Sequence, residues 1–265
     1  KLARFLQHDS IFSSDIEMKE TGALDIRLEK TQTPVIPQTD MASIRFMFQE
    51  MNQQYMEHQP AAYYVTAKRI MDVTISILFI VTIMSWLTPI LALLIKLTSK
   101  GPVFFVQKRT GYMGTEFDCF KFRTMYINDE AHIRQVSIND KRITRIGKFL
   151  RVTHLDETPQ FFNVLLGDMS VVGPRPHMLY HTRYYSECIP YYNLRLEVLP
   201  GMTGMAQIKD YIGEISVERE LRKRIQWDIY YMKNRSIWLD INILITTIGC
   251  VFSKAFQLVR GKSGK

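Results

Sequence analysis

The sequence predicts an α+β fold that is mostly helical, in which a re-entrant membrane helix hairpin precedes a small domain with short strands and interfacial amphipathic helices. Two observations predict the membrane element: residues 73–95 contain no charged side chain, and Pro89 interrupts this run. A third predicts the domain, because strand-like runs and helical patterns follow the apolar run. We expect three segments: an N-terminal extension at 1–60, the re-entrant helix at 61–100 and the folded domain at 101–265. The extension is compatible with the remnant of an upstream domain.

The composition points to an acidic partner that is not nucleic acid. The 265 residues carry a formal net charge of +8, which favours binding to phosphates or anionic surfaces. No RNA- or DNA-binding motif accompanies this charge, and the basic residues lie beside apolar segments, so membrane lipids and phosphorylated substrates are the expected partners. The three cysteines are widely spaced and odd in number, which argues against a disulfide framework or a zinc pattern and predicts free thiols.

The uncharged segment is long enough to span a bilayer, but its flanks favour re-entry from one side. Its 23 residues would measure about 35 Å as a straight helix. Pro89 removes a backbone hydrogen bond and bends the helix, and Thr88 can donate to a carbonyl that this frees. Basic residues at both ends draw both ends to the cytoplasmic face: Lys68, Arg69, Lys96, Lys100, Lys108 and Arg109. A plain spanning helix and a buried core helix remain alternatives.

Turn and cap residues delimit shorter elements in the rest of the chain. The expected elements are strands at 102–107 and 117–122 around a turn at 111–114, and helices at 159–166, 218–234 and 237–259. The first of these helices should have Thr158 as its N-cap and end at Gly167. The last has an uncharged part, 241–253, that is too short to span a membrane and suits the membrane interface or packing against the first apolar helix.

Asp156 and Glu157 are the first candidates for chemistry, because these adjacent carboxylates precede a predicted helix. The helix dipole and Arg151 should keep one carboxylate ionised, while repulsion raises the pKa of the other. Two acids with separated pKa values can divide into a nucleophile and a proton donor or metal ligand. Taken alone, such a pair is also a common N-terminal cap of a surface helix.

Basic residues near this pair are candidates for binding phosphate. Arg175 stands between Pro174 and Pro176 in a stiff turn, where a planar guanidinium suits a diphosphate. Lys121 and Arg123 lie on one face at the end of a predicted strand. In isolation, an ordinary structural turn and a solvated edge strand explain these residues equally well.

Magnesium is the expected cofactor, because it commonly accompanies diphosphate chemistry and is held by one or two carboxylates together with phosphate oxygens. Asp156 and Glu157 are the candidate ligands. His177 and His181 have a spacing that could hold zinc, but no acid on the same helix completes that set.

Ordered motifs across about residues 66 to 260 resemble the bacterial sugar transferase family, the monotopic polyprenyl-phosphate phosphoglycosyl transferases. The matching segments are Lys68–Asp72, Thr88-Pro89, Gly101–Phe105, Gln107–Gly111, Phe120–Met125, Arg142–Arg151, Leu155–Gln160, Asn163–Leu165, Gly167–Ser170, Gly173–Pro176 and Pro200–Gly204. So many matches in the same order favour the functional interpretation of the acid pair and of the basic residues over the ordinary structural ones.

The resemblance implies a two-step exchange through a covalent intermediate. Asp156 would attack the sugar-bearing phosphate of a UDP-sugar and release UMP, and undecaprenyl phosphate would then take the phosphosugar. Glu157 would be a helper or magnesium contact. The phosphate-binding residues would be Lys121, Arg123, Arg151 and Arg175. The domain at 101–265 would be catalytic, on the cytoplasmic face of a bacterial inner membrane, serving the first membrane step of exopolysaccharide, capsule or O-antigen synthesis.

Some positions depart from the family pattern and bear on the sugar. His154 stands where serine is usual, and Ala206 replaces a frequent tryptophan. The run 210–215 loosely matches that of hexose-transferring members, which favours a glucose- or galactose-type donor. A non-catalytic membrane scaffold and a spanning transferase without a covalent intermediate are the rival hypotheses, and a homo-oligomer is compatible with the sequence.

Overall fold

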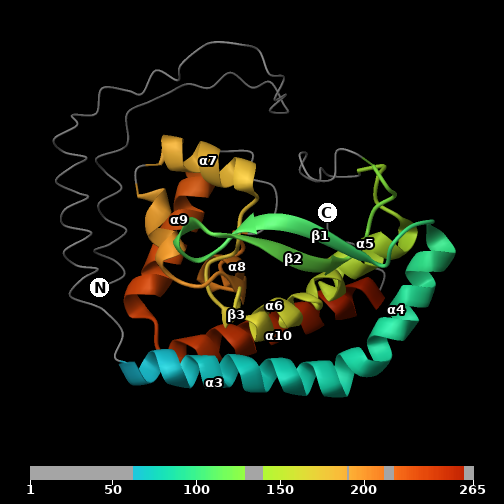
Figure 1. Cartoon of the computed structure of the whole chain (residues 1–265), viewed down its shortest axis with the longest axis horizontal. Helices are drawn as coiled ribbons and strands as arrows, with labels where there is room; N and C mark the ends of the chain where they lie inside the picture. Colours follow the sequence, from blue (N-terminus) through green and yellow to red (C-terminus); the bar gives the residue numbers. More distant parts are fainter. Residues whose placement is uncertain (1–61, 129–139, 190, 212–217, 260–265) are drawn as a thin grey trace, which may run out of the picture. The chain divides into compact units, whose positions relative to one another are not determined.

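The computed structural model describes residues 62–128, 140–189, 191–211 and 218–259 of the chain. They form mostly helices with two small two-stranded sheets, which confirms the mostly helical α+β class (Figure 1). In order these are α3 (Ala62–Phe79), a π-helical segment (Ile80–Met84), α4 (Ser85–Thr98), β1 (Phe104–Thr110), β2 (Glu116–Phe122), α5 (Arg145–Val152), α6 (Gln160–Leu166), β3 (Ser170–Val172), α7 (Leu179–Cys188), β4 (Gly201–Thr203), α8 (Met205–Ile208), α9 (Glu218–Asn234) and α10 (Ile237–Val259). The predicted extension at 1–60 lies outside the described residues.

A bend separates α3 from α4 within one long apolar helix (Figure 1). The backbone at the bend is π-helical over Ile80–Met84, one turn before Pro89. Proline has no N–H for the carbonyl four residues earlier and its ring clashes with that carbonyl, so its effect falls on the preceding turn. The side chains of Ser85 and Trp86 donate to the carbonyls of Val81 and Thr82 in this segment, at 2.7 and 2.8 Å. Pro89 frees the carbonyl of Ser85, so the role expected of Thr88 stays a prediction.

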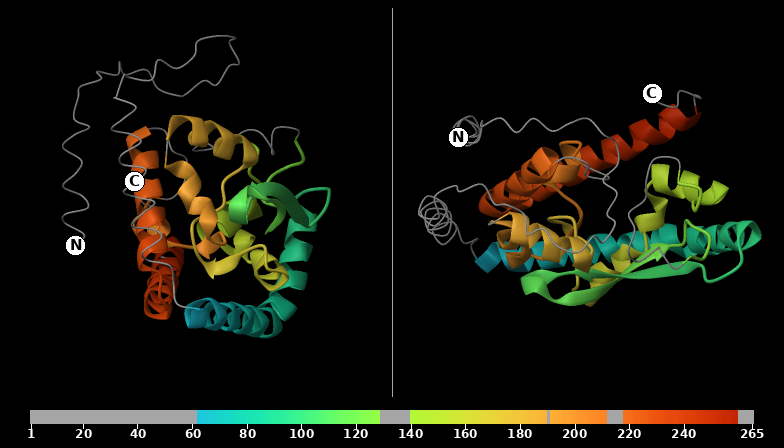
Figure 2. Two further views of the ribbon diagram at one scale, coloured as in Figure 1. Left: turned by 60° about the vertical axis from the view of Figure 1, so that its left-hand side comes forward. Right: turned by 90° about the horizontal axis from the view of Figure 1, so that it is seen from above.

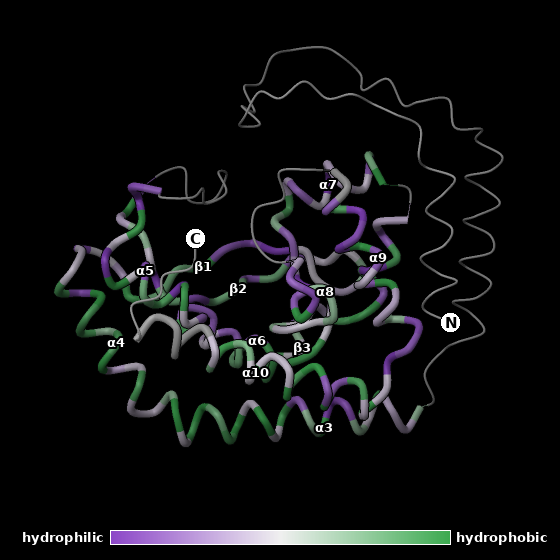
Figure 3. The backbone as a smooth tube through the Cα atoms, turned by 180° about the vertical axis from the view of Figure 1, so that it is seen from behind, coloured by the Kyte–Doolittle hydropathy of each residue, from purple (hydrophilic) through white to green (hydrophobic). Residues whose placement is uncertain are grey.

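By length and composition, Ala62–Thr98 is the one helix among the described residues that could cross a membrane, and most of its apolar part is exposed. Hydrophobic residues run along most of α4 and the adjoining part of α3 (Figure 3). Helix α10 contains a shorter apolar stretch, Ile237–Ser253, with exposed Trp238 and Phe252. That both ends of the long helix meet one membrane face stays a prediction.

Strands β1 and β2 form the predicted hairpin, although β1 extends further than predicted, to Thr110. Their antiparallel register pairs Gln107 with Cys119 and Arg109 with Phe117. Because side chains alternate along each strand, these four residues share one face with Lys121. Phe117 and Cys119 on this face belong to the main hydrophobic core, so the face is turned toward the rest of the domain.

The loop after β3 is held by a second, parallel pair of strands, β3 and β4. Gly173 N–H donates to the carbonyl of Thr203, and Gly201 N–H donates to the carbonyl of Pro174 (2.8 and 2.9 Å). The backbones approach so closely that a Cβ on Gly201 would lie 2.0 Å from the nitrogen of Gly173. Only glycine fits this approach. The contacts of Gly173 and Pro174 with β4 in turn fix where the next residue, Arg175, leaves the sheet.

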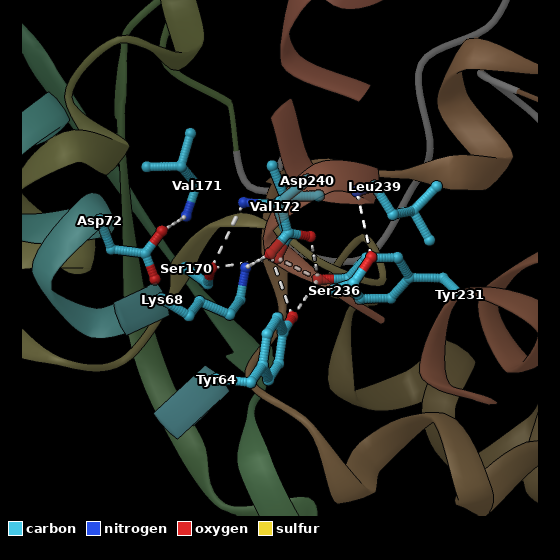
Figure 4. A network of polar contacts seen from close by, with 10 residues as sticks. All are labelled: Tyr64, Lys68, Asp72, Ser170, Val171, Val172, Tyr231, Ser236, Leu239 and Asp240. Carbon is cyan, nitrogen blue, oxygen red and sulfur yellow. Dashed lines mark hydrogen bonds and ion pairs between the residues drawn. The ribbon is translucent and has the colours of Figure 1, made fainter. Parts of the chain in front are cut away.

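A buried polar network fastens the start of α3 to α9 and α10 (Figure 4). The Asp240 carboxylate accepts hydrogen bonds from the hydroxyls of Tyr64 (3.0 Å) and Tyr231 (2.7 Å) and forms an ion pair with Lys68 (3.0 Å). One turn along α3, the Asp72 carboxylate accepts from the N–H of Val171 in β3 (3.0 Å). Helix α10 begins next to α3 and diverges from it toward its C-terminal end (Figure 2).

Arg69 connects α3 to α6, the short helix that follows the acid pair. Its guanidinium donates to the last carbonyls of α6, those of Val164 (2.6 Å) and Leu165 (2.9 Å). The Val164 carbonyl also accepts from the N–H of the C-cap residue Gly167 (3.2 Å), and the added cation complements the dipole at this end. The apolar helix is thereby joined directly to an element that positions Asp156 and Glu157.

Candidate active site

Asp156 and Glu157 lie in a 3₁₀ turn, Leu155–Glu157, that leads into α6. The prediction that Thr158 is the N-cap of this helix was wrong. Thr158 is itself in helical conformation and its hydroxyl donates to the carbonyl of Leu155 (2.9 Å), because the chain is already coiled before α6 begins. The turn starts at His154, which adopts the left-handed conformation (φ 57°) that is uncommon for a residue with a side chain.

Glu157 is held by two cations on different elements. Lys121 at the end of β2 donates to Glu157 Oε1 (3.0 Å), and Arg175 binds both carboxylate oxygens in a forked pair, with Nη1 at 3.0 Å from Oε2. Bidentate pairs of this kind fix orientation as well as charge. The structure therefore brings Lys121 and Arg175 to the acid pair, as the sequence predicted.

The two acids have different pKa values because their surroundings differ. Burial and the neighbouring charge of Glu157 raise the pKa of Asp156 to about 6. Burial also opposes ionisation of Glu157, but Arg175 and Lys121 outweigh it and hold the pKa of Glu157 well below its usual range. Glu157 is thus ionised at neutral pH and cannot serve as a proton donor, whereas Asp156 titrates within the physiological range.

The Asp156 carboxylate is buried but accepts no hydrogen bond from the residues that the structure describes. Arg151 lies close enough to lower the pKa of Asp156, together with Lys121 and Arg175. Arg151 itself is positioned by Thr124, whose hydroxyl accepts from its Nε (2.8 Å). Asp156 is therefore a desolvated carboxylate surrounded by cations and free to react, while Glu157 organises two of those cations.

Arg123 does not join this cluster. Its guanidinium donates to the backbone carbonyls of Ser99 (2.8 Å) and Lys100, just after the end of α4. Strand β2 ends at Phe122, so the alternation that would align Arg123 with Lys121 ends there too. The observed contacts of Arg123 fasten α4 to the domain, and its predicted phosphate binding has no support in this geometry.

Comparison with known proteins matches residues 63–254 to the bacterial sugar transferase family. The chain belongs to this family. A UDP-glucose:undecaprenyl-phosphate glucose-1-phosphate transferase of Xanthomonas campestris pv. campestris is 46% identical over 189 residues, covering 70% of this chain and 38% of the relative. The protein of the same name from Caulobacter vibrioides is 41% identical, covering 68% of each chain. A UDP-N-acetylgalactosamine-undecaprenyl-phosphate N-acetylgalactosaminephosphotransferase of Aeromonas hydrophila is 41% identical, covering 73% of this chain and 45% of the relative.

The matched region is only part of the longer relatives. The Xanthomonas protein and a Klebsiella pneumoniae protein of the same name, 47% identical, are covered over 38% and 39% of their lengths. The family comparison confirms the resemblance inferred from the ordered motifs, and its limits contain every residue of the candidate site.

A second layer of this sugar transferase site supports Arg175. The carbonyl of Arg175 accepts from Arg195 Nη2 (2.6 Å), and Arg195 forms a buried ion pair with Asp228 of α9 (2.8 Å). Each of these two side chains is only 2% exposed, so the pair is desolvated and geometrically fixed. Their separation in sequence, more than 30 residues, left no local pattern from which this support could be predicted.

The histidines considered for zinc lie in an aromatic cluster instead. His177 Nδ1 lies 2.7 Å from the Tyr192 hydroxyl, and His181 stacks on Tyr185. Burial and the charge of Arg195 hold the pKa of His177 well below its usual value, so this ring is neutral. Among the described residues, His, Cys, Asp and Glu form no group of three or more that could hold a metal ion.

The donor set at the acid pair still suits magnesium in one limited way. Both oxygens of Glu157 are engaged by Lys121 and Arg175, whereas Asp156 has a free carboxylate. Magnesium is commonly bound by one or two carboxylates plus substrate phosphate oxygens and waters. Asp156 therefore fits as a single protein ligand, and Glu157 retains one acceptor position, on Oε2, beside its bonds to Lys121 and Arg175.

Proposed function

We propose that this protein transfers a hexose-1-phosphate from a UDP-sugar to undecaprenyl phosphate and releases UMP. The observation that carries the proposal is the division within the acid pair: Asp156 is ionisable near neutral pH and unpaired, while Glu157 holds Lys121 and Arg175 beside it. The names of the relatives, which refer to UDP-sugars and undecaprenyl phosphate, support this choice of substrates.

In the first step, a carboxylate oxygen of Asp156 attacks the phosphorus that bears the sugar. A bond forms between this oxygen and phosphorus, the bond from phosphorus to the bridging oxygen breaks, and UMP leaves with that electron pair. Above a pH of about 6 the carboxylate is mostly ionised and already desolvated, so it needs no separate base. The product on the protein is an aspartyl phosphosugar.

In the second step, a phosphate oxygen of undecaprenyl phosphate attacks the same phosphorus. The bond to Asp156 breaks, its carboxylate is regenerated, and polyprenyl-diphospho-sugar departs. The covalent route divides one difficult transfer between two diphosphate-like molecules into two easier exchanges.

The nearby cations stabilise the negative charge of the transferring group. Arg151, Lys121 and Arg175 all act on the charge of Asp156, so a phosphoryl group bonded to Asp156 would lie within their reach. Glu157 fixes the direction of two of them and keeps the site from carrying a large unbalanced positive charge before substrate arrives. Bound magnesium, held by Asp156 and phosphate oxygens, would supply further charge neutralisation.

We further infer that the site lies at the cytoplasmic face of a bacterial inner membrane. The exposed apolar side chains of α3, α4 and α10 suit the lipid, and the flanking lysines and arginines favour a re-entrant rather than a spanning path. A 44% identical exopolysaccharide production protein of Rhizobium leguminosarum bv. phaseoli supports a role in the first membrane step of surface polysaccharide synthesis.

The deciding experiment measures UMP release from a panel of UDP-sugars by the purified protein with undecaprenyl phosphate and magnesium. We expect release from UDP-glucose or UDP-galactose, its loss in Asp156→Asn, and a phosphosugar adduct on the peptide containing Asp156 in the wild type. Arg123→Gln is the control for removing a nearby charge outside the cluster. UMP release that persists in Asp156→Asn refutes the nucleophile assignment, and inactivity with every UDP-sugar favours the membrane scaffold.

A further inference from the structure

A pocket next to the acid pair has a residue that the proposed steps do not use, Arg109. The pocket is small and partly open, and the space in it together with the adjoining solvent is about 200 Å³. Its lining residues come from both hairpin strands, from α6 and from the loop after β3: Arg109, Cys119, Lys121, Gln160, Arg175 and Pro176. Lys121 and Arg175 thus face both Glu157 and this pocket, whereas Asp156 is not among the lining residues.

The pocket has more positive than negative charge. Lys121 and Arg175 share the single carboxylate of Glu157, and Arg109 forms no ion pair with any described residue. Burial raises the pKa of the Cys119 thiol, so this neighbour stays neutral rather than supplying a negative charge. A pocket lined by three cations with one carboxylate between them is suited to an anion.

Arg109 is held in place but retains free donors. Its Nη1 donates to the carbonyl of Pro176 (3.2 Å) and its Nη2 to Gln107 Oε1 (2.6 Å). Its Nε is buried and has no hydrogen-bond partner among the described residues. A buried, unsatisfied donor on a charged group is unfavourable unless a ligand completes it, since an arginine guanidinium does not lose its proton.

Arg109 lies near the acid pair through Glu157 and Arg175, whose charges act on it. It also lines the same pocket as Lys121 and Arg175. A phosphoryl group transferred to Asp156 requires the attacking and leaving oxygens to be roughly in line. The leaving phosphate must therefore lie on the opposite side of the phosphorus from Asp156. The pocket that Arg109 lines together with Lys121 and Arg175 provides a place for it.

We propose that Arg109 and this pocket form one phosphate subsite that is used twice: by the phosphate of the departing UMP, and then by the phosphate of the attacking polyprenyl phosphate. This inference rests on the proposed function. In the first step the phosphorus–oxygen bond to UMP breaks as the bond to Asp156 forms. In the second step the acceptor oxygen attacks from the side that UMP vacated, and the bond to Asp156 breaks. Both phosphates must therefore occupy the same place in turn.

The test is direct binding of UMP to the purified full chain, measured by calorimetry in the absence of UDP-sugar. Arg109→Gln should weaken UMP binding about tenfold, the usual effect of losing a hydrogen bond to a charged group. Lys108→Gln is the matched control, because Lys108 is the neighbouring cation on the opposite face of β1 and is 57% exposed. It should leave the affinity unchanged. Equal affinity of wild type and Arg109→Gln overturns the proposal.

Two further measurements keep the proposal testable if Arg109→Gln folds poorly. Arg109→Lys retains the charge but loses the guanidinium donors, so it should bind UMP more weakly than the wild type; an affinity equal to that of the wild type would contradict a contact from the guanidinium. Farnesyl phosphate, a short polyprenyl phosphate, should compete with UMP in the wild type. Simultaneous binding of both would refute a shared subsite, whereas absence of UMP release from UDP-sugars in the wild type would instead refute the proposed function.

Discussion

Replacing Glu157 by glutamine separates the two effects that this residue has on its neighbour. The substitution removes the negative charge that helps raise the pKa of Asp156, but keeps a side chain of nearly the same shape. In the wild type this pKa is raised from 3.8 to about 6, with burial as the larger cause and Glu157 as the second. Burial remains in the variant, so we expect the pKa of Asp156 to fall by about one unit, equivalent to about 1.4 kcal/mol.

The expected fall in the pKa of Asp156 can be measured from the pH dependence of the first step. Only ionised Asp156 can attack, so UMP release should rise with pH through about 6 in the wild type. In Glu157→Gln this rise should move to lower pH. The maximal rate should fall at least tenfold, because Lys121 and Arg175 lose the carboxylate that orients them.

The assay is a rapid-quench measurement of the first UMP released, between pH 4.5 and pH 8. Glu116→Gln is the control, because Glu116 is an exposed acid at the far end of β2. It should change neither the position of the rise nor the maximal rate. A rise that stays in place, or moves to higher pH, in Glu157→Gln would refute the coupling between the two carboxylates.

Three further predictions concern stability. Asp156→Asn should raise the melting temperature above pH 6, where the buried carboxylate of the wild type is ionised and destabilises the folded state. The gain should vanish as the pH falls from 6 to 4 and this carboxylate becomes protonated; a pH-independent gain contradicts this. Arg195→Met should lower the free energy of unfolding by about 3–5 kcal/mol, since it leaves Asp228 buried without a partner, and denaturant titration would show whether the loss is smaller. Gly201→Ala should cost about 1–3 kcal/mol because its Cβ meets the backbone of Gly173, and an unchanged melting temperature would disprove that close approach.

Local chemistry in the sequence was enough to predict much of the site. The adjacent acids, the proline-flanked Arg175 and the strand-end Lys121 each have a short-range signature, and the structure brings them together. Arg123 has a similar signature but lies elsewhere, because strand alternation stops at Phe122.

Contacts between distant segments could not be predicted in the same way. Arg109 looked like a flanking charge of the membrane segment until the hairpin register placed it on the same face as Lys121. The support that Arg195 gives Arg175 depends on how α9 packs, which no spacing in the sequence reveals. The prediction of Thr158 as a cap failed for a local reason: a turn that starts at His154 already coils the chain before α6 begins.

The anchors on α3 also set a length scale for the bend. Asp72 is bonded to β3, and the π-helical segment begins at Ile80, eight residues further along the helix. At 1.5 Å per residue this distance is about 12 Å, less than half of the roughly 30 Å hydrocarbon thickness of a bilayer. On the proposed re-entrant path, a helix that enters the bilayer at Asp72 would therefore turn within a single leaflet. The number of residues between Asp72 and the bend thus sets the depth that the helix reaches. Inserting one full helical turn there would change this depth without altering any residue of the site.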